Sequence, residues 1–309
     1  MALSLWSFFS CSKESALPQE QRALQFSTVE SKSNLSLPFT TFKVWGEVCV
    51  ASSSEPLPLI QGYRVNYINN NNQWSYTQGE GTEGQEMKYW SYSADEYRFH
   101  AGAPDYVTNA SGQQVAGIVR NAGTPAITEN SLTLKMIATK EIKETSLYSQ
   151  PYLVRRTDPS FGSLVNLKFC YAHAKVNVAF KYVSGSTITI KEIKLIPPAA
   201  IATEATLQIK YDWAKPAVSA GTLDISAKGI STSSPLEFNP IENISANSKE
   251  YHSSSPWYLI PDPASKGDWK LSITVASEGV ADVTKEVTFT VSKAWESGKA
   301  YLYRFEYTD

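Results

Sequence analysis

The stretch VNLKFCYAHAKVNVAF, residues 165–180, decides the fold class of this chain. From Val165 to Tyr171 the large apolar residues stand at the odd positions, which is the period of a β-strand with one face inward. From Ala174 onward they stand at the even positions, so the phase reverses beside His173. A reversal inside one strand indicates a bulge, because one extra residue exchanges the two faces of a sheet. We therefore predict a bulged strand near the middle of the chain.

The same alternation appears on both sides of this stretch. Strands are predicted at residues 42–50, 63–67, 74–76, 187–195, 207–211, 271–275, 287–291 and 301–307. An asparagine run, residues 69–72, suits the turn between the second and third of these strands. Only residues 198–206 and 133–145 leave room for a short helical piece. Many short strands separated by turn signals are typical of sandwiches and barrels, so we predict an all-β chain of two tandem β-sandwiches.

A domain boundary is predicted between Ser149 and Ser163, where prolines, charges and a glycine replace the alternation. At 309 residues the chain is long enough for two domains. We expect a signal and linker over residues 1–22, an N-terminal domain over 23–158 and a C-terminal domain over 159–309.

Composition and motifs argue against an enzyme or a nucleic-acid reader. The formal net charge is −2, and no basic stretch is interleaved with aromatic residues. The chain lacks HExxH, CxxC, G-x-S-x-G and Gly-rich phosphate loops, and its three histidines have no second ligand at metal spacing. We expect no catalytic residues, no metal, no cofactor and no nucleic-acid partner.

The N-terminus places Cys11 directly after the apolar run Ala2–Ser10 and before a polar, charged stretch. That run is too short to span a bilayer, which needs about 20 apolar residues. A small residue followed by cysteine resembles the lipobox of bacterial lipoproteins, in which the cysteine is acylated. No Lys or Arg precedes the run, and Phe8 stands where the lipobox has leucine. The alternative is a hydrophobic N-terminus that packs on the fold.

Aromatic residues suggest a second possibility for function. A sugar-stacking platform could be formed by Trp74, Tyr76, Tyr89, Trp90 and Tyr92. The same residues could instead fill the core of a sandwich. The first reading favours a glycan-binding cell-surface lipoprotein, and it requires exposed aromatic residues in a row.

Further motifs, taken in their order along the chain, resemble the fimbrillins of Bacteroidetes, the FimA- and Mfa-type fimbrial subunits. They cover nearly the whole sequence. In the first half they are Cys11-Ser-Lys13, Leu24–Thr28, Thr41-Phe-Lys-Val-Trp45, Asn69–Tyr76, and Trp90 followed by Tyr97–Pro104. In the second half they are Leu167–Val176, Tyr258-Leu-Ile-Pro261 and Trp295–Tyr301.

This resemblance implies two transthyretin-like β-sandwich domains and export as a lipoprotein anchored in the outer membrane through Cys11. It also implies that a protease removes the lipidated segment with the first strand. A strand from another fimbrial subunit then enters the vacated groove, and the fimbrium grows by this donor-strand exchange. The expected partners are other subunits, the outer membrane through the lipid, and a ligand on a host or bacterial surface.

On this sequence the displaced strand would be Ala23–Glu30, with Leu24, Phe26 and Thr28 on one face. The family's usual cut follows an Arg in the loop after that strand, but residues 31–38 hold only Lys32 as a basic residue. Arg22 is the other candidate processing site, and a cut there would leave the strand in place. The roles of uncleaved anchor, tip or accessory subunit, and surface lipoprotein that never polymerises therefore stay open. No extra donor strand is evident beyond Asp309, so if the family's donor is a C-terminal extension, this chain would receive a strand without giving one, as a tip subunit would.

Overall fold

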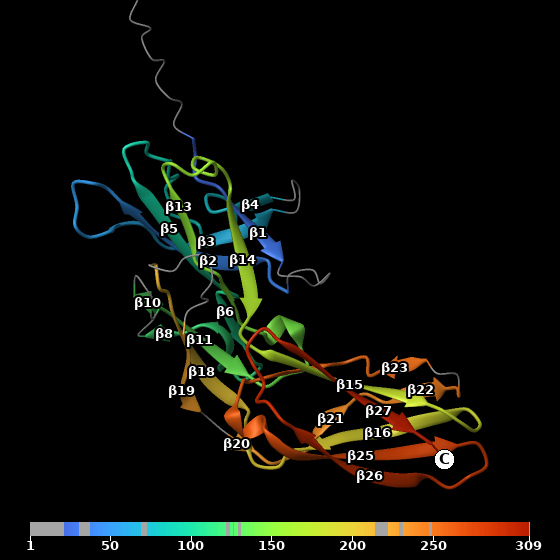
Figure 1. Ribbon diagram of the computed structural model, residues 1–309. Coiled ribbons are helices and arrows are strands. Elements are labelled where there is room, and N and C mark those ends of the chain that lie inside the picture. Colours follow the sequence, from blue (N-terminus) through green and yellow to red (C-terminus); the bar gives the residue numbers. More distant parts are fainter. Residues whose placement is uncertain are drawn as a thin grey trace, which may run out of the picture.

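The computed structural model describes residues 22–30, 38–68, 73–121, 124–125, 127–128, 131–213, 222–228, 231–246 and 249–308. The fold is all-β, and Figure 1 shows an upper blue-to-green body above a lower yellow-to-red body. Short 3-10 turns occupy Ile142–Glu144 and Pro263–Ser265. In the described part of the chain, no helix has the length and apolar character needed to cross a membrane.

A first sheet forms most of the upper body (Figure 1). It curls, so that the two ends of the sheet approach each other around a common core, and Phe26 at one end packs against Tyr76 at the other with ring centroids 5.7 Å apart. Its strands follow the order β1 (Phe26–Glu30), β14 (Val165–Tyr171), β12 (Leu147–Ser149), β5 (Glu96–Ala103), β2 (Thr41–Cys49), β3 (Leu57–Ile68) and β4 (Gln73–Ser75), and β13 (Tyr152–Arg155) also pairs with β5.

A second sheet covers the outer face of the first. A core between the two sheets holds Tyr148 of β12 and half-buried Trp45 of β2 together with Leu134 and Leu207 of the second sheet. The second sheet follows the order β19 (Thr222–Lys228), β18 (Glu204–Lys210), β11 (Ser131–Ile137), β7 (Gln114–Ile118) and β6 (Tyr106–Thr108), with β10 (Ile127–Thr128) on β11. The short pairs are β8 (Arg120–Asn121) with β9 (Thr124–Pro125), and β17 (Ile201–Ala202) with β20 (Ser231–Thr232).

The lower body is a sandwich of a third and a fourth sheet around a separate core. Trp269, Phe180 and Ile190 are among its fully buried side chains. In the third sheet, β15 (Ala174–Tyr182) pairs with β23 (Glu250–His252), β24 (Trp257–Leu259) and β27 (Ala300–Tyr307). The fourth sheet contains β21 (Leu236–Phe238), β22 (Ile241–Ile244), β16 (Ile188–Ile196), β25 (Gly267–Ser277) and β26 (Val283–Val291).

The stretch 165–180 connects the two bodies. Its first half is β14 in the first sheet, and its second half is β15 in the third sheet. The phase reversal therefore marks the passage of the chain from one core to another, and the prediction of a bulge inside one strand was wrong. Buried Ala172 and His173 make the passage, and His173 Nε2 lies 3.0 Å from the carbonyl oxygen of Ile137.

Several strands predicted from alternation are confirmed. Residues 63–67 and 74–75 lie in the paired strands β3 and β4, although the asparagine run between them lies outside the described residues. Residues 271–275 lie in β25 and residues 287–291 lie in β26, and these two strands pair antiparallel. Residues 198–206, where a helical piece was considered, contain β17 and the start of β18 instead.

Strand pairing crosses the middle of the sequence at two places. Val165–Tyr171 pairs with β1 and β12, and Glu204–Lys210 pairs with β11. Both segments follow residue 158 in the sequence and lie in sheets whose other strands come mainly from the first half. The domain limits 23–158 and 159–309, and the transthyretin-like character of each sandwich, stay predictions.

Candidate functional site

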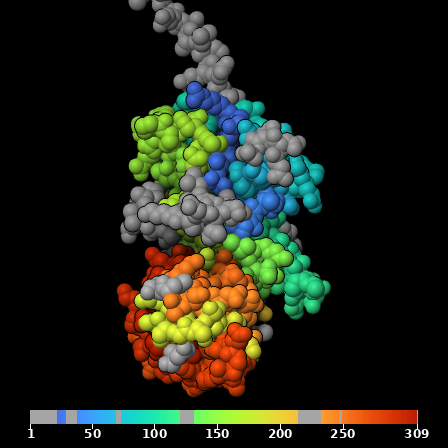
Figure 2. Space-filling model, turned by 90° about the vertical axis from the view of Figure 1, so that its right-hand side faces the viewer, coloured from blue at the N-terminus to red at the C-terminus, as the bar shows by residue number. Residues whose placement is uncertain are grey.

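The first strand and the groove that holds it form the candidate functional site. Leu24 and Phe26 are 0% and 3% exposed, Thr28 is half-buried, and Gln25 between the two apolar residues is exposed. The predicted alternation therefore puts Leu24 and Phe26 into the core. Figure 2 shows dark blue atoms of this segment at the surface, between a cyan and a yellow-green part of the upper body.

The first half of the segment pairs antiparallel with residues 88–90. Ala23 forms a bridge with Tyr89. The Leu24 N–H donates to the Lys88 carbonyl at 2.8 Å, and the Trp90 N–H donates to the Arg22 carbonyl at 2.9 Å. Backbone hydrogen bonds of this kind do not depend on the identity of the side chains in the strand.

The second half pairs parallel with β14. The register runs from Phe26 opposite Val165 to Glu30 opposite Phe169. The Val165 N–H donates to the Gln25 carbonyl at 2.9 Å, which extends the ladder to the start of the strand. β1 is the terminal strand of the described sheet, so its removal would leave the backbone groups along one side of β14 unpaired.

The floor of the groove is aromatic. The ring of Phe26 meets Tyr76 and Phe99 edge to face, with centroids 5.7 Å and 5.6 Å away. Trp90 and Val165 are buried in the same core. Edge-to-face pairs of this kind add to the free energy of area burial, so Phe26 is the main side-chain anchor of the strand.

Tyr76 links the floor to both strands of the first wall. Its hydroxyl donates to the Leu24 carbonyl at 3.0 Å and accepts from the Lys88 N–H at 3.0 Å. Burial raises the pKa of the Tyr76 phenol above its ordinary value, so the hydroxyl stays protonated and can donate at neutral pH. One side chain therefore fixes the spacing between the first strand and residue 88.

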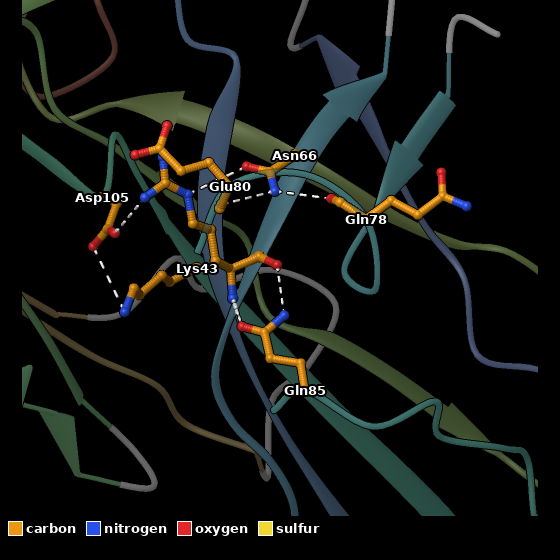
Figure 3. A network of polar contacts seen from close by, with 7 residues as sticks. Lys43, Asn66, Gln78, Glu80, Gln85 and Asp105 are labelled. Carbon is orange, nitrogen blue, oxygen red and sulfur yellow. Dashed lines mark hydrogen bonds and ion pairs between the residues drawn. The ribbon is translucent and has the colours of Figure 1, made fainter. Parts of the chain in front are cut away.

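A polar network on the outer side of β3 holds the loop that leads to this wall (Figure 3). Gln85 accepts from the Arg64 N–H at 2.7 Å, and its amide donates to the Arg64 carbonyl at 2.9 Å and to the Tyr76 carbonyl. Asp105 is 6% exposed, and its carboxylate oxygens lie 3.8 Å from Lys43 Nζ and 3.8 Å from Arg64 Nη1. The network fixes the backbone on both sides of the loop, and this positions residues 88–90.

Asn66 fixes the tip of the same loop. Its side-chain amide donates to the carbonyls of Gln78 and Glu80 at 3.0 Å and 3.1 Å (Figure 3). Gly79 lies between them with φ of 95°, and a Cβ there would come within 2.7 Å of the Asn66 amide nitrogen. Only glycine combines this backbone conformation with so close an approach.

The arrangement can bind an extended peptide. With residues 22–30 absent, two backbone walls would face each other across an apolar floor. An incoming strand could restore the main-chain hydrogen bonds and place alternate side chains in the positions of Leu24 and Phe26.

The other predicted site residues are placed as follows. Arg22 is exposed, and its carbonyl accepts from Trp90, so a cut after it would leave residues 23–30 in the groove. Cys11 and Lys32 lie outside the described residues. Lipidation at Cys11 and processing at Lys32 or Arg22 remain predictions.

The aromatic residues do not form the exposed row that the glycan-binding alternative requires. Tyr76 and Trp90 are 4% and 1% exposed, and Trp74 is half-buried against Phe39 and Phe42. Tyr89 is exposed, and Tyr92 is half-buried against Phe161. Tyr76, Trp90 and Trp74 belong to the core around the first strand.

The histidines and acidic residues do not converge either. Burial lowers the pKa of His100 to about 3 and that of His173 to about 4, so both side chains are neutral at neutral pH. His252 lies at the surface, 3.5 Å from Glu250. Within the described ranges, no cluster of three or more His, Cys, Asp or Glu side chains could hold a metal ion.

Sequence reasoning missed the walls of the groove. β14 lies far from β1 in the sequence, and parallel pairing has no turn that would signal it. Tyr76 and Trp90 were considered both for a sugar platform and for a sandwich core, and they lie in the core that forms the floor of the groove. The glycine-rich and polar composition of residues 77–87 is the signal that could have indicated an ordered, side-chain-bonded loop.

Comparison with known proteins supplies the family context. A family model described as fimbrillin-like matches residues 51–309. A solved structure of a candidate cell adhesion protein from Bacteroides ovatus has a TM-score of 0.50 and 14% identity, with 93% of each chain covered, and it shares this fold. A candidate cell adhesion protein from Bacteroides uniformis has a TM-score of 0.45 and 16% identity over 94% of each chain. No curated protein matches the sequence.

Proposed function

The chain belongs to the fimbrillin-like family, and from this premise we propose that it is a structural and adhesive subunit of a cell-surface fimbrium that assembles by strand exchange. Family membership implies a non-enzymatic protein at the cell surface that associates with other subunits or surface ligands. The strand-exchange step and the lipid anchor are the finer parts of the proposal.

The observation that carries the proposal is the way in which the first strand is held. Its described backbone partners are β14 on one side and residues 88–90 on the other, and its apolar anchors Leu24 and Phe26 are buried. β1 is the terminal strand of the described sheet, and residues 22–24 join it to residues 88–90 on the other side. It can therefore leave without breaking any pair except its own.

Exchange would replace one strand by another of the same pattern. The incoming strand of a second subunit would regain the ladder with β14 and fill the positions of Leu24 and Phe26. Because a buried strand is lost and a buried strand is gained, the free energy of exchange is small. The direction is then set by what happens to the released strand, and removal by a protease makes the exchange irreversible.

The processing site decides which role the chain has. A cut after Lys32 would detach both the anchor at Cys11 and the strand Ala23–Glu30, and the groove would open. A cut after Arg22 would release the chain from the lipid but keep the groove filled. No cut would leave an anchored subunit that cannot accept a partner strand.

Intact mass and N-terminal sequencing of the protein taken from native cells test this proposal. The polymerising role predicts a mature chain that begins after Lys32 and lacks Ala23–Glu30. An acylated Cys11 with the strand retained would instead support an anchor. A chain that is neither acylated nor cut, and that is found inside the cell, would contradict a surface subunit altogether.

A further inference from the structure

The lower body has an uncovered strand at its edge. β26 pairs with β25 along its whole length without a register shift, and in the described part of the chain no strand pairs with its other side. Figure 1 shows it as the outermost strand at the bottom of the molecule. Its sequence, VTKEVTFTV, surrounds the charged pair Lys285 and Glu286 with β-branched and aromatic residues and has no proline, and every residue except Phe289 and Val291 is exposed. Natural proteins usually cover or interrupt such an edge, so this one has the character of an interface.

The inner face of β26 extends beyond the sheet that should cover it. Val283 and Val287 are 44% and 48% exposed, although they share the inner face with buried Val291. Their neighbours across the ladder, Val275 and Leu271, are 3% and 2% exposed. β27 is the edge strand of the third sheet, which covers the fourth sheet. The apolar inner face of the fourth sheet therefore extends one strand, β26, beyond this cover.

A groove of about 500 Å³ lies at this flank, between β26 and β27. Its floor includes Phe180 and Leu271, and Val287 forms part of its wall. Charged residues beside it are paired within the chain: Arg304 with Glu250 at 2.6 Å, for example. The flank thus offers apolar side chains and backbone groups rather than unpaired charge.

We propose that β26 pairs antiparallel with β26 of a second copy of this chain, about a twofold axis at Val287. Val287 is the midpoint of the strand, so this register pairs all nine of its residues. It sets Lys285 opposite Phe289 and Glu286 opposite Thr288, and it joins the exposed Val287 side chains of the two copies. The two fourth sheets then become one continuous sheet across the axis.

Charge selects this register over its neighbours. The inner faces of the two β26 strands lie on the same side of the joined sheet only when the twofold axis passes through a residue. An axis between two residues would set an inner residue opposite an outer one, because successive side chains alternate between the faces of a strand. An axis at Lys285 or Glu286 would set like charges directly opposite each other, which is destabilising. An axis at Thr288 would leave Val283 beyond the end of the partner strand. The Val287 register avoids both faults, and it sets Lys285, whose Nζ already lies over the Tyr307 ring of its own chain, opposite Phe289 of the second copy.

The expected dimer is weak and independent of strand exchange. One strand from each copy buries a small area compared with the ~800 Å² per partner of a standard interface, so the fraction of dimer should depend on protein concentration. The contact lies in the lower body, away from the first-strand groove in the upper body (Figure 1). It would join subunits side by side, whether or not they also exchange strands.

Disulfide capture tests the register in the otherwise unchanged chain. In the proposed dimer Val287 faces itself, and the Cα–Cα distance of about 4.5–5.5 Å in an antiparallel pair allows a disulfide. Under mild oxidation Val287→Cys should form a linked dimer about tenfold faster than Val280→Cys, whose residue is 61% exposed but lies outside the strand. Val283→Cys faces Val291 of the second copy and should behave like the Val280 control.

Sedimentation velocity on the reduced proteins provides the second readout. The unmodified chain should show a dimer that grows with concentration, and Val287→Lys should remove it by setting two cations face to face. The proposal would be overturned if Val287→Cys and Val280→Cys formed the disulfide-linked dimer at equal rates. It would also be overturned if Val283→Cys formed it faster than Val287→Cys. A dimer that persists in Val287→Lys, or an unmodified chain that stays monomeric at its solubility limit, would also refute it.

Discussion

Replacing Phe26 by alanine should release the first strand while the rest of the molecule stays folded. Phe26 is 3% exposed, and its ring packs against Tyr76 and Phe99 at 5.7 Å and 5.6 Å. Truncating a buried phenylalanine to alanine costs about 3–5 kcal/mol. Because the strand is terminal in its sheet, this cost falls on local opening rather than on global unfolding. At about 1.4 kcal/mol per factor of ten, the open population should rise by about two to four orders of magnitude.

Amide hydrogen exchange measures this opening directly. The N–H groups of Leu24 and Val165 bond across the two walls of the groove, so both should exchange faster in Phe26→Ala. The matched control is Gln25→Ala, because Gln25 is the exposed neighbour and its truncation should change stability by no more than about 0.5 kcal/mol. Amides of β25 in the lower body report on global unfolding and should not change.

Two results would refute this reasoning. If Phe26→Ala and Gln25→Ala accelerate exchange equally, the ring does not anchor the strand. If amides of β25 accelerate as much as Leu24, the strand opens only when the whole chain unfolds. In that case the groove could not be vacated by a folded subunit.

The remaining predictions concern hydrogen bonding, pH and the second core. Tyr76→Phe removes the hydroxyl bonds to Leu24 and Lys88, so exchange at Leu24 should rise by about fivefold, for a net contribution of about 1 kcal/mol. Buried His173 has a pKa of about 4, against about 6.5 when unfolded, so its contribution to stability is intact above pH 6.5 and is lost as the pH falls toward 4. The free energy of unfolding, measured by urea denaturation, should therefore fall between pH 7 and pH 5 by about 2 kcal/mol more in the parent chain than in His173→Gln. Trp269→Ala removes a fully buried side chain and should lower the unfolding free energy of the lower body by about 3–5 kcal/mol, with no change in exchange at Leu24.

Alternation and turn residues predicted the strands and the pairing of neighbours such as residues 63–67 with 74–75, but not the partners that lie far away in the sequence. Residues 63–67, 74–75 and 271–275 have the expected strand form because a half-buried strand imposes a period of two on its own sequence. The phase reversal at His173 was visible, but one sequence cannot distinguish a bulge from a passage between two sheets. That distinction depends on which core each half enters, and this is decided by residues far away, such as Phe26 for β14 and Tyr301 for β15.

The candidate site was predictable only in part. The alternation of Leu24 and Phe26 indicated the buried face of the first strand, and the structure gives both residues that position. The walls could not be derived, because a parallel pair between residues 26 and 165 has no local signal. Trp90 could serve as core or as platform by its chemistry alone, and only the tertiary packing assigns it to the core.

Peptide exchange into a cut chain tests the central claim most directly. A specific protease site would replace residues 31–37, and the folded chain would be cut and mixed with a labelled synthetic peptide of residues 23–30. The account predicts that the cut chain takes up the label, that the uncut chain does not, and that a peptide with Phe26→Ala competes poorly. If the cut chain remains folded and takes up no label, or if cut and uncut chains take up equal amounts, the first strand does not fill an exchangeable groove.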